Sequence, residues 1–124
     1  MSDSRPEVLA AARLAPMYVE QLQSRYTLLD RLHETDPAAL AAAAPRIQAI
    51  AAQGETQVTE SLMAQLPALK LISVMGVGYD RIDVAAAKRR GVVVTHTPDV
   101  LNDEVAHTAL GLMLCAARQF PAAD

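Results

Sequence analysis

The chain has 124 residues, a net charge of −3 and 52% apolar residues, which suits one folded domain with its own core. The acidic balance, without a basic stripe, argues against a nucleic-acid partner, and no apolar run is long enough to cross a membrane. The single cysteine, Cys115, excludes an intrachain disulfide. Because the N-terminus also lacks a secretion signal, we expect a cytoplasmic protein.

The first half of the chain is expected to alternate strands with helices. Apolar runs predict strands over 7–12, 26–29 and 47–52, and helical spacing predicts helices over 16–24, 38–44 and 59–65. Asp36 followed by Pro37 is typical of a helix start, and Thr59 is the expected cap of the third helix. Pro45 and Gly54 provide stops.

The second half centres on a βαβ unit. An apolar run over 69–74 leads into a glycine loop, then into a helix that Asp83 or Asp80 caps, and a second apolar run begins at Val92 after Gly91. The last predicted helix, 101–118, has Asn102 or Asp103 as its cap and is apolar around most of its circumference, so either the domain or a partner should cover it.

Five strands alternating with five helices predict an α/β fold with a parallel sheet. Right-handed crossovers restrict the topology. We expect a flavodoxin-like, doubly wound five-stranded sheet of order 2-1-3-4-5 with helices on both faces.

Gly76-Val77-Gly78 is the motif with the clearest chemistry. A dinucleotide fingerprint would need a third glycine where Arg81 stands and an acidic residue after the next strand, and both are missing. Two glycines before a helix can still form an anion cradle, in which the amides of Val77 and Gly78 hold a small carboxylate, although the spacing alone favours a tight turn without any ligand.

Four segments together are specific: 66–72 (Leu-Pro-Ala-Leu-Lys-Leu-Ile), 76–83 (Gly-Val-Gly-Tyr-Asp-Arg-Ile-Asp), 90–92 (Arg-Gly-Val) and 97–106 (Thr-Pro-Asp-Val-Leu-Asn-Asp-Glu-Val-Ala). With them the chain resembles the D-isomer-specific 2-hydroxyacid dehydrogenases, most closely the glyoxylate/hydroxypyruvate reductase branch. The resemblance implies a substrate-binding domain over 1–118, ending in an inter-domain crossing helix over 101–118. Residues 119–124 would be a truncated linker, and the NAD(P)-binding domain would be absent.

The resemblance also implies what the chain contributes. The complete enzyme would use NAD(P) to reduce a 2-oxoacid such as glyoxylate or hydroxypyruvate to the D-2-hydroxyacid. Its catalytic Arg, Glu and His would lie in the missing part, so the chain alone is expected to be inactive and to bind no cofactor. A stand-alone flavodoxin-like module, binding a carboxylate or serving oligomerisation without redox activity, is the alternative.

Individual residues carry over in the same way. The resemblance implies that Val77 and Gly78, with Gly76 beside them, bind the substrate carboxylate and that Gly54 lines the same cleft. Val105 would pack near the nicotinamide. The expected partners are a small 2-oxoacid or 2-hydroxyacid and a second copy of the chain, with a homodimer formed through the crossing helix.

Three histidines have simpler interpretations. The family commonly has Asn at the position of His96, and we expect this strand-end side chain to have a backbone partner rather than a catalytic role. His107 departs from an acidic family position and is expected at an interface or surface. His33 is expected at the surface. No metal site is expected.

Overall fold

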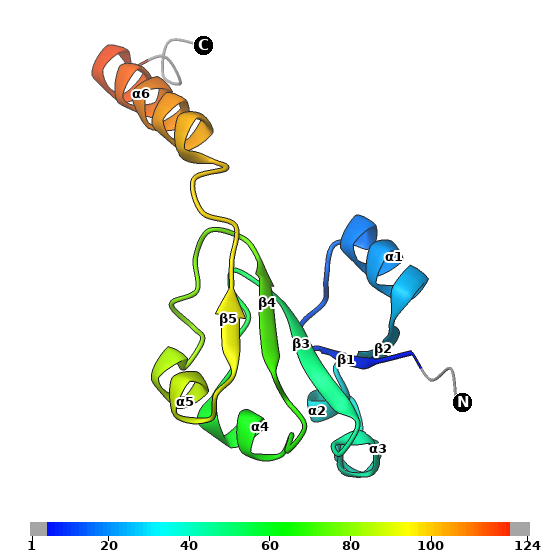
Figure 1. Ribbon diagram of the computed structural model, residues 1–124. Coiled ribbons are helices and arrows are strands. Elements are labelled where there is room, and N and C mark those ends of the chain that lie inside the picture. Colours follow the sequence, from blue (N-terminus) through cyan, green and yellow to red (C-terminus); the bar gives the residue numbers. More distant parts are fainter. Residues whose placement is uncertain (1–4, 120–124) are drawn as a thin grey trace.

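The structure is a computed structural model and describes residues 5–119. Its centre is a five-stranded sheet in which all neighbouring strands are parallel, in the order β2-β1-β3-β4-β5 (Figure 1). The strands are β1 (Glu7–Ala10), β2 (Thr27–Asp30), β3 (Ile47–Gln53), β4 (Leu71–Met75) and β5 (Val93–Thr95). The predicted α/β class and strand order are confirmed.

Six helices connect or follow the strands in the described part of the chain. They are α1 (Pro16–Arg25), α2 (Leu32–Thr35), α3 (Pro37–Ala43), α4 (Glu60–Ala64), α5 (Val84–Arg89) and α6 (Asn102–Arg118). Five correspond to predicted helices. The sixth, α2, is not predicted by the sequence pattern because its four residues are too few for helical periodicity, and it begins after Arg31 with a left-handed φ of 45°.

Side-chain caps follow the predictions at three helices and differ at one. The cap residues that accept a backbone N–H from the first turn are Asp36, Thr59 and Asp83. The predicted caps of α6 are wrong, because Leu101 occupies the cap position without a side-chain bond. Asn102 instead donates to the carboxylate of Asp99, in a turn that Asp99 forms with a φ of 65°.

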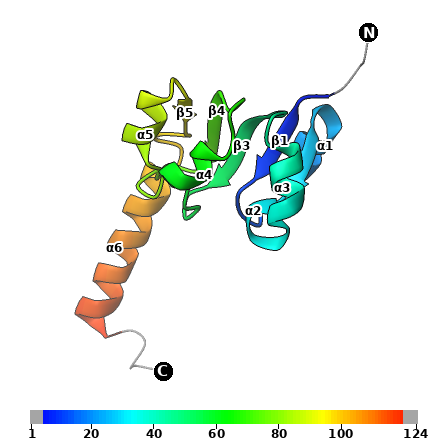
Figure 2. The ribbon, with the colours of Figure 1, turned by 90° about the horizontal axis from the view of Figure 1, so that it is seen from below.

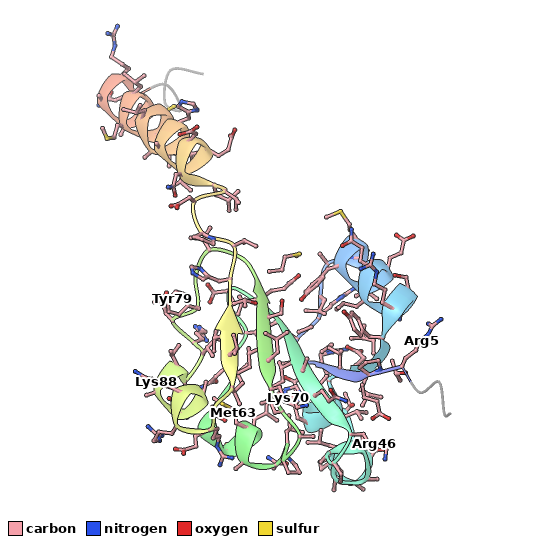
Figure 3. All side chains as sticks on the ribbon, in the orientation of Figure 1. Arg5, Arg46, Met63, Lys70, Tyr79 and Lys88 are labelled. Atoms are coloured by element: carbon pink, nitrogen blue, oxygen red, sulfur yellow. The ribbon has the colours of Figure 1, made fainter. Side chains whose placement is uncertain are left out.

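The main core lies on the face of the sheet that α3, α4 and α5 cover. Because strand side chains alternate between faces, Leu9, Ile50 and Ile72 from three adjacent strands all point into this layer and are completely buried. The helices supply the opposing side chains Leu40, Met63, Ala86 and Ala87 (Met63 is labelled in Figure 3). This packed layer therefore holds the strands in place, and with them the loops at the carboxyl edge of the sheet.

The opposite face has a smaller core under α1. Val8 and Ala10 of β1 and Ala51 of β3 pack with Tyr18 and Leu22 of this helix. Helices therefore lie on both faces, as predicted, but coverage is unequal: Val93 of β5 is 58% exposed although it pairs with Leu71 inside the sheet.

The last helix, α6, extends away from the rest of the molecule in Figures 1 and 2 and contains no buried residue. Within residues 5–119 nothing buries a residue of this helix, so cover by the chain's own domain is not seen and cover by a partner stays a prediction. Across residues 5–119, no helix is long and apolar enough to pass through a membrane. The predicted linker 119–124 lies outside the described residues except for Gln119.

Candidate functional site

The glycine loop leaves the carboxyl end of β4, next to the loop that leaves β3. Gly76 has a φ of +155°, and a Cβ atom built on it would lie 3.2 Å from the backbone nitrogen of Gly54. This distance is shorter than most Cβ contacts, so glycine at position 76 lets the two loops approach this closely without a shift of the backbone. The structure thus brings Gly54, Gly76 and Gly78 together, as a shared site would require.

The amides of Val77 and Gly78 have no hydrogen-bond acceptor within the part of the chain that the structure describes. Val77 is 36% exposed and Gly78 is partly exposed, so the bend is not sealed inside the core. Two adjacent N–H groups at a solvent-facing bend are suited to an anion, which would accept both bonds. Their assignment to a substrate carboxylate stays a prediction.

The carbonyl groups of the same loop are engaged by residues that follow β5. The Thr97 amide donates to the Gly76 carbonyl oxygen over 2.9 Å, and His96 Nδ1 lies 2.8 Å from the Val77 carbonyl oxygen. The expected backbone partner of His96 is confirmed. The ring of Tyr79, labelled in Figure 3, packs edge-to-face on His96 with ring centroids 4.8 Å apart.

The loop after β3 is held by Gln53 and Thr56, which the sequence analysis does not single out. The Gln53 side chain accepts from the Ala15 amide at 2.7 Å and donates to the Arg13 carbonyl at 3.2 Å, which ties the loop after β1 to the loop after β3. Thr56 is buried and its hydroxyl accepts from the Gln53 amide at 2.8 Å. The sequence feature that could have indicated these contacts is a glutamine at the end of an apolar strand, followed three residues later by a threonine.

The proposed nicotinamide contact, Val105, is not brought to the glycine loop. Val105 lies on α6, is 63% exposed, and borders a hollow that only α6 and its cap residue form. His107 on the same helix is exposed, as expected. His33, expected at the surface, is partly buried: its side chain is 16% exposed and lines a surface hollow, with Nε2 3.7 Å from Glu34 and Nδ1 buried without a partner among the described residues.

Several observations limit what this chain can do chemically. Among residues 5–119, no group of three or more His, Cys, Asp or Glu side chains could hold a metal ion. Five surface hollows of about 360 to 480 Å³ are lined by residues other than Val77 and Gly78. The glycine loop stands at the carboxyl edge of the sheet with Val77 36% exposed, so it can form one wall of a binding site.

Comparison with known proteins identifies the protein family to which the chain belongs. The family model described as D-isomer specific 2-hydroxyacid dehydrogenase, catalytic domain, matches residues 8–113. The chain belongs to this family. The family resemblance found in the sequence is thereby confirmed.

Individual relatives agree. Over 77 residues, or 62% of this chain, it is 42% identical to the glyoxylate/hydroxypyruvate reductase HPR3 of Arabidopsis thaliana, of which it covers 24%. Over 98% of the chain it is 38% identical to D-3-phosphoglycerate dehydrogenase of Mycobacterium tuberculosis, of which it covers 23%. The chain therefore spans about a quarter of these curated relatives.

Solved structures show the same fold. A 2-hydroxyacid dehydrogenase from Ketogulonicigenium vulgare Y25 superposes with a TM-score of 0.87 at 40% identity, covering 97% of this chain and 38% of that one. The NADPH-dependent glyoxylate/hydroxypyruvate reductase of Sinorhizobium meliloti, solved with NADP and malonate, gives a TM-score of 0.78 at 38% identity, covering 90% and 34%. The latter protein holds a small dicarboxylate.

Proposed function

We propose that the chain is the substrate-binding part of an NAD(P)-dependent D-2-hydroxyacid dehydrogenase that reduces a 2-oxoacid such as glyoxylate or hydroxypyruvate. In this proposal residues 1–118 form the substrate-binding domain, helix 101–118 crosses to the cofactor domain, and 119–124 begins a linker. The supporting observation is that the Val77 and Gly78 amides, at the carboxyl edge of the sheet, have no acceptor among residues 5–119, in a chain whose family is named for 2-hydroxyacids, which are carboxylates.

The proposed role of the chain is positioning. Two N–H groups that bind the carboxylate of a 2-oxoacid fix the direction of its adjacent carbonyl, so that one face of that carbonyl is presented to the hydride donor. Gly54 leaves the space beside them open because it has no side chain. The catalytic Arg, Glu and His, which polarise the carbonyl and deliver the proton, are assigned to the remainder of the longer enzyme.

NAD(P) does not fit the described residues by themselves. The glycine loop has Arg81 where a third glycine would stand, and β5 is followed by His96 and Thr97 rather than by an acidic side chain. Val105 as a nicotinamide contact would need α6 to be covered by a further domain. We therefore assign cofactor binding to the rest of the enzyme.

Binding is tested by titrating the chain with oxalate, a small dicarboxylate, and following the backbone amide signals by NMR. We expect the largest shift changes at Val77 and Gly78, with smaller ones at Gly54 and Gly76. Shift changes spread evenly over the chain, or centred on another hollow, would contradict the carboxylate site. In the same sample, NADH with glyoxylate is expected to show no turnover, and measurable oxidation by pure protein would refute the division of roles.

A stand-alone binding or oligomerisation module is the second candidate, and α6 favours it. This helix presents several exposed apolar side chains, including Leu110, Leu112 and Met113, and has no cover in the described structure. A coding sequence that continues beyond residue 124 into a GxGxxG segment would remove this candidate. For both candidates we expect a homodimer through α6 and a reducing, cytoplasmic location.

A further inference from the structure

The two amides of the proposed carboxylate site belong to peptide groups whose carbonyl oxygens both accept a hydrogen bond. In a trans peptide the C=O of one residue and the N–H of the next point in opposite directions. The Gly76 carbonyl shares a peptide group with the Val77 amide, and the Val77 carbonyl shares one with the Gly78 amide. Whatever binds these two carbonyls therefore determines where the two N–H groups point.

Both carbonyls are bound by residues that immediately follow β5. The Thr97 amide donates to the Gly76 oxygen, and His96 Nδ1 contacts the Val77 oxygen. Since β5 lies at one edge of the sheet and β3 lies on the other side of β4, both N–H groups are directed away from β5. The Val77 amide is thus oriented by a backbone donor, whereas the Gly78 amide depends on a side chain.

The contact with Val77 also defines the state of the His96 ring. A carbonyl oxygen only accepts hydrogen bonds, so Nδ1 must carry the hydrogen. Tyr79, packed edge-to-face on the imidazole, restricts its rotation and keeps Nδ1 directed at the loop. A bond donated to the carbonyl further polarises the peptide group, which strengthens the Gly78 N–H as a donor.

We propose that His96 is a positioning residue for the carboxylate site: its Nδ1–H holds the Val77 carbonyl and thereby aims the Gly78 amide at the ligand. The proposal rests on the proposed function only for the identity of the ligand. The orientation itself is a property of the free protein. His96 does not touch the substrate and takes no part in proton transfer.

The orientation is tested without any ligand. Residual dipolar couplings report the direction of each N–H bond, and they are compared for the unmodified chain, His96→Ala and His96→Asn. Asn places its amide nitrogen the same number of bonds from Cα as His Nδ1, so it can donate to the same oxygen. We expect His96→Ala to change the coupling of Gly78 but not of Val77, which Thr97 still orients, and His96→Asn to restore it.

Binding is measured on the same variants with oxalate as the probe. The loss of one oriented donor predicts about three- to tenfold weaker binding for His96→Ala, and His96→Asn should recover most of it. His107→Ala, on α6, is the control and should bind like the unmodified chain. If His96 had only a structural role, His96→Ala would change thermal stability but would not change the dipolar coupling of Gly78 differently from that of Val77.

Two different results distinguish the two proposals. If oxalate does not perturb Val77 and Gly78 in the unmodified chain, the carboxylate site is wrong, while the dipolar couplings still decide the role of His96. If the Gly78 coupling is the same in His96→Ala as in the unmodified chain, the positioning role is overturned even where oxalate binds. A Gly78 change that His96→Asn fails to reverse also overturns it, because the donor would then not be the cause.

Discussion

Gly76 and Gly78 lie in the same loop, but the structure constrains them differently. At Gly76 the positive φ is strained for any other residue, and a Cβ atom would lie 3.2 Å from the Gly54 nitrogen, so the neighbouring backbone would have to shift. At Gly78 a Cβ atom would meet only Asp80 Oδ2, at an ordinary 3.7 Å, among the described residues outside its chain neighbours. Nothing in the described packing therefore excludes a methyl group at Gly78, and a need for glycine there would have to come from a ligand bound at its amide.

Gly78→Ala separates the two explanations. We expect the free energy of unfolding to stay level or rise by about 0.4 to 1 kcal/mol, because alanine restricts the unfolded chain. Oxalate binding should weaken by about tenfold, equivalent to about 1.4 kcal/mol, because the methyl group crowds the bound anion. Urea unfolding and the NMR titration measure the two quantities. Equal affinity in both proteins would favour the turn without a ligand.

Gly76→Ala should act on the fold instead. The strained φ and the contact with Gly54 predict a loss of about 1 to 3 kcal/mol in the free energy of unfolding. Gly111→Ala is the matched control, because a Cβ atom there meets nothing within 4 Å and alanine favours the helix. If Gly76→Ala were as stable as its control, the close approach of the two loops would not be required.

At the scale of elements, the loop is held between β5 and α5. Residues 96 and 97 extend the contact between β4 and β5 beyond the last ladder pair, Ser73 with Thr95, and so fix the start of the loop. The end of the loop enters α5, where Asp83 accepts from the Ala86 amide at 2.9 Å. Gly91 ends this region with a φ of +68°. The start of the loop is thus held by the residues after β5, and its end is held by α5.

Asp83→Ala should release that anchor. Removal of a side-chain cap typically costs about 0.5 to 2 kcal/mol, and Asn at the same position should retain most of the bond. Asp80→Ala serves as the control, because Asp80 was the alternative cap in the sequence but is exposed and caps nothing. Thermal unfolding of the three variants measures the difference. A larger loss in Asp80→Ala than in Asp83→Ala would contradict the assignment.

At the scale of the whole molecule, two apolar surfaces have no cover from any residue between 5 and 119. One is the stripe on α6 that includes Val105 and Leu112, which is 66% exposed, and the other is the part of the sheet around Val93 that α1 does not reach. A monomer with both surfaces in water has a strong tendency to associate. The same surfaces would be covered in a longer enzyme or in a dimer.

The expected result is concentration-dependent self-association, measured by analytical ultracentrifugation. Leu112→Glu should shift the equilibrium toward the monomer because it places a charge within the α6 stripe. Met17→Glu changes an equally exposed apolar residue on α1 and should leave association as it was. A monomeric mass for the unmodified chain at high concentration would count against an interface on α6.

Much of the architecture is determined by local patterns. Apolar runs, Asp36, Thr59 and Asp83 as caps, and Gly91 as a stop predict the strands and five of the helices, because capping and periodicity act within a few residues. The short α2 and the cap of α6 escape such patterns, since both depend on backbone conformations at Arg31 and Asp99 that their sequence neighbours do not reveal.

The sequence by itself determined the fold class, the strand order, the family and the loop where a carboxylate is proposed to bind. Only the tertiary structure decided that, among residues 5–119, the Val77 and Gly78 amides have no acceptor and no residue of α6 is buried, and that His96 and Thr97 bind the carbonyl oxygens of the same peptide groups. The reason is distance along the chain. Residues 54, 76 and 96 meet only when three parallel strands end side by side, and no local pattern encodes which hydrogen-bonding groups such a meeting leaves free.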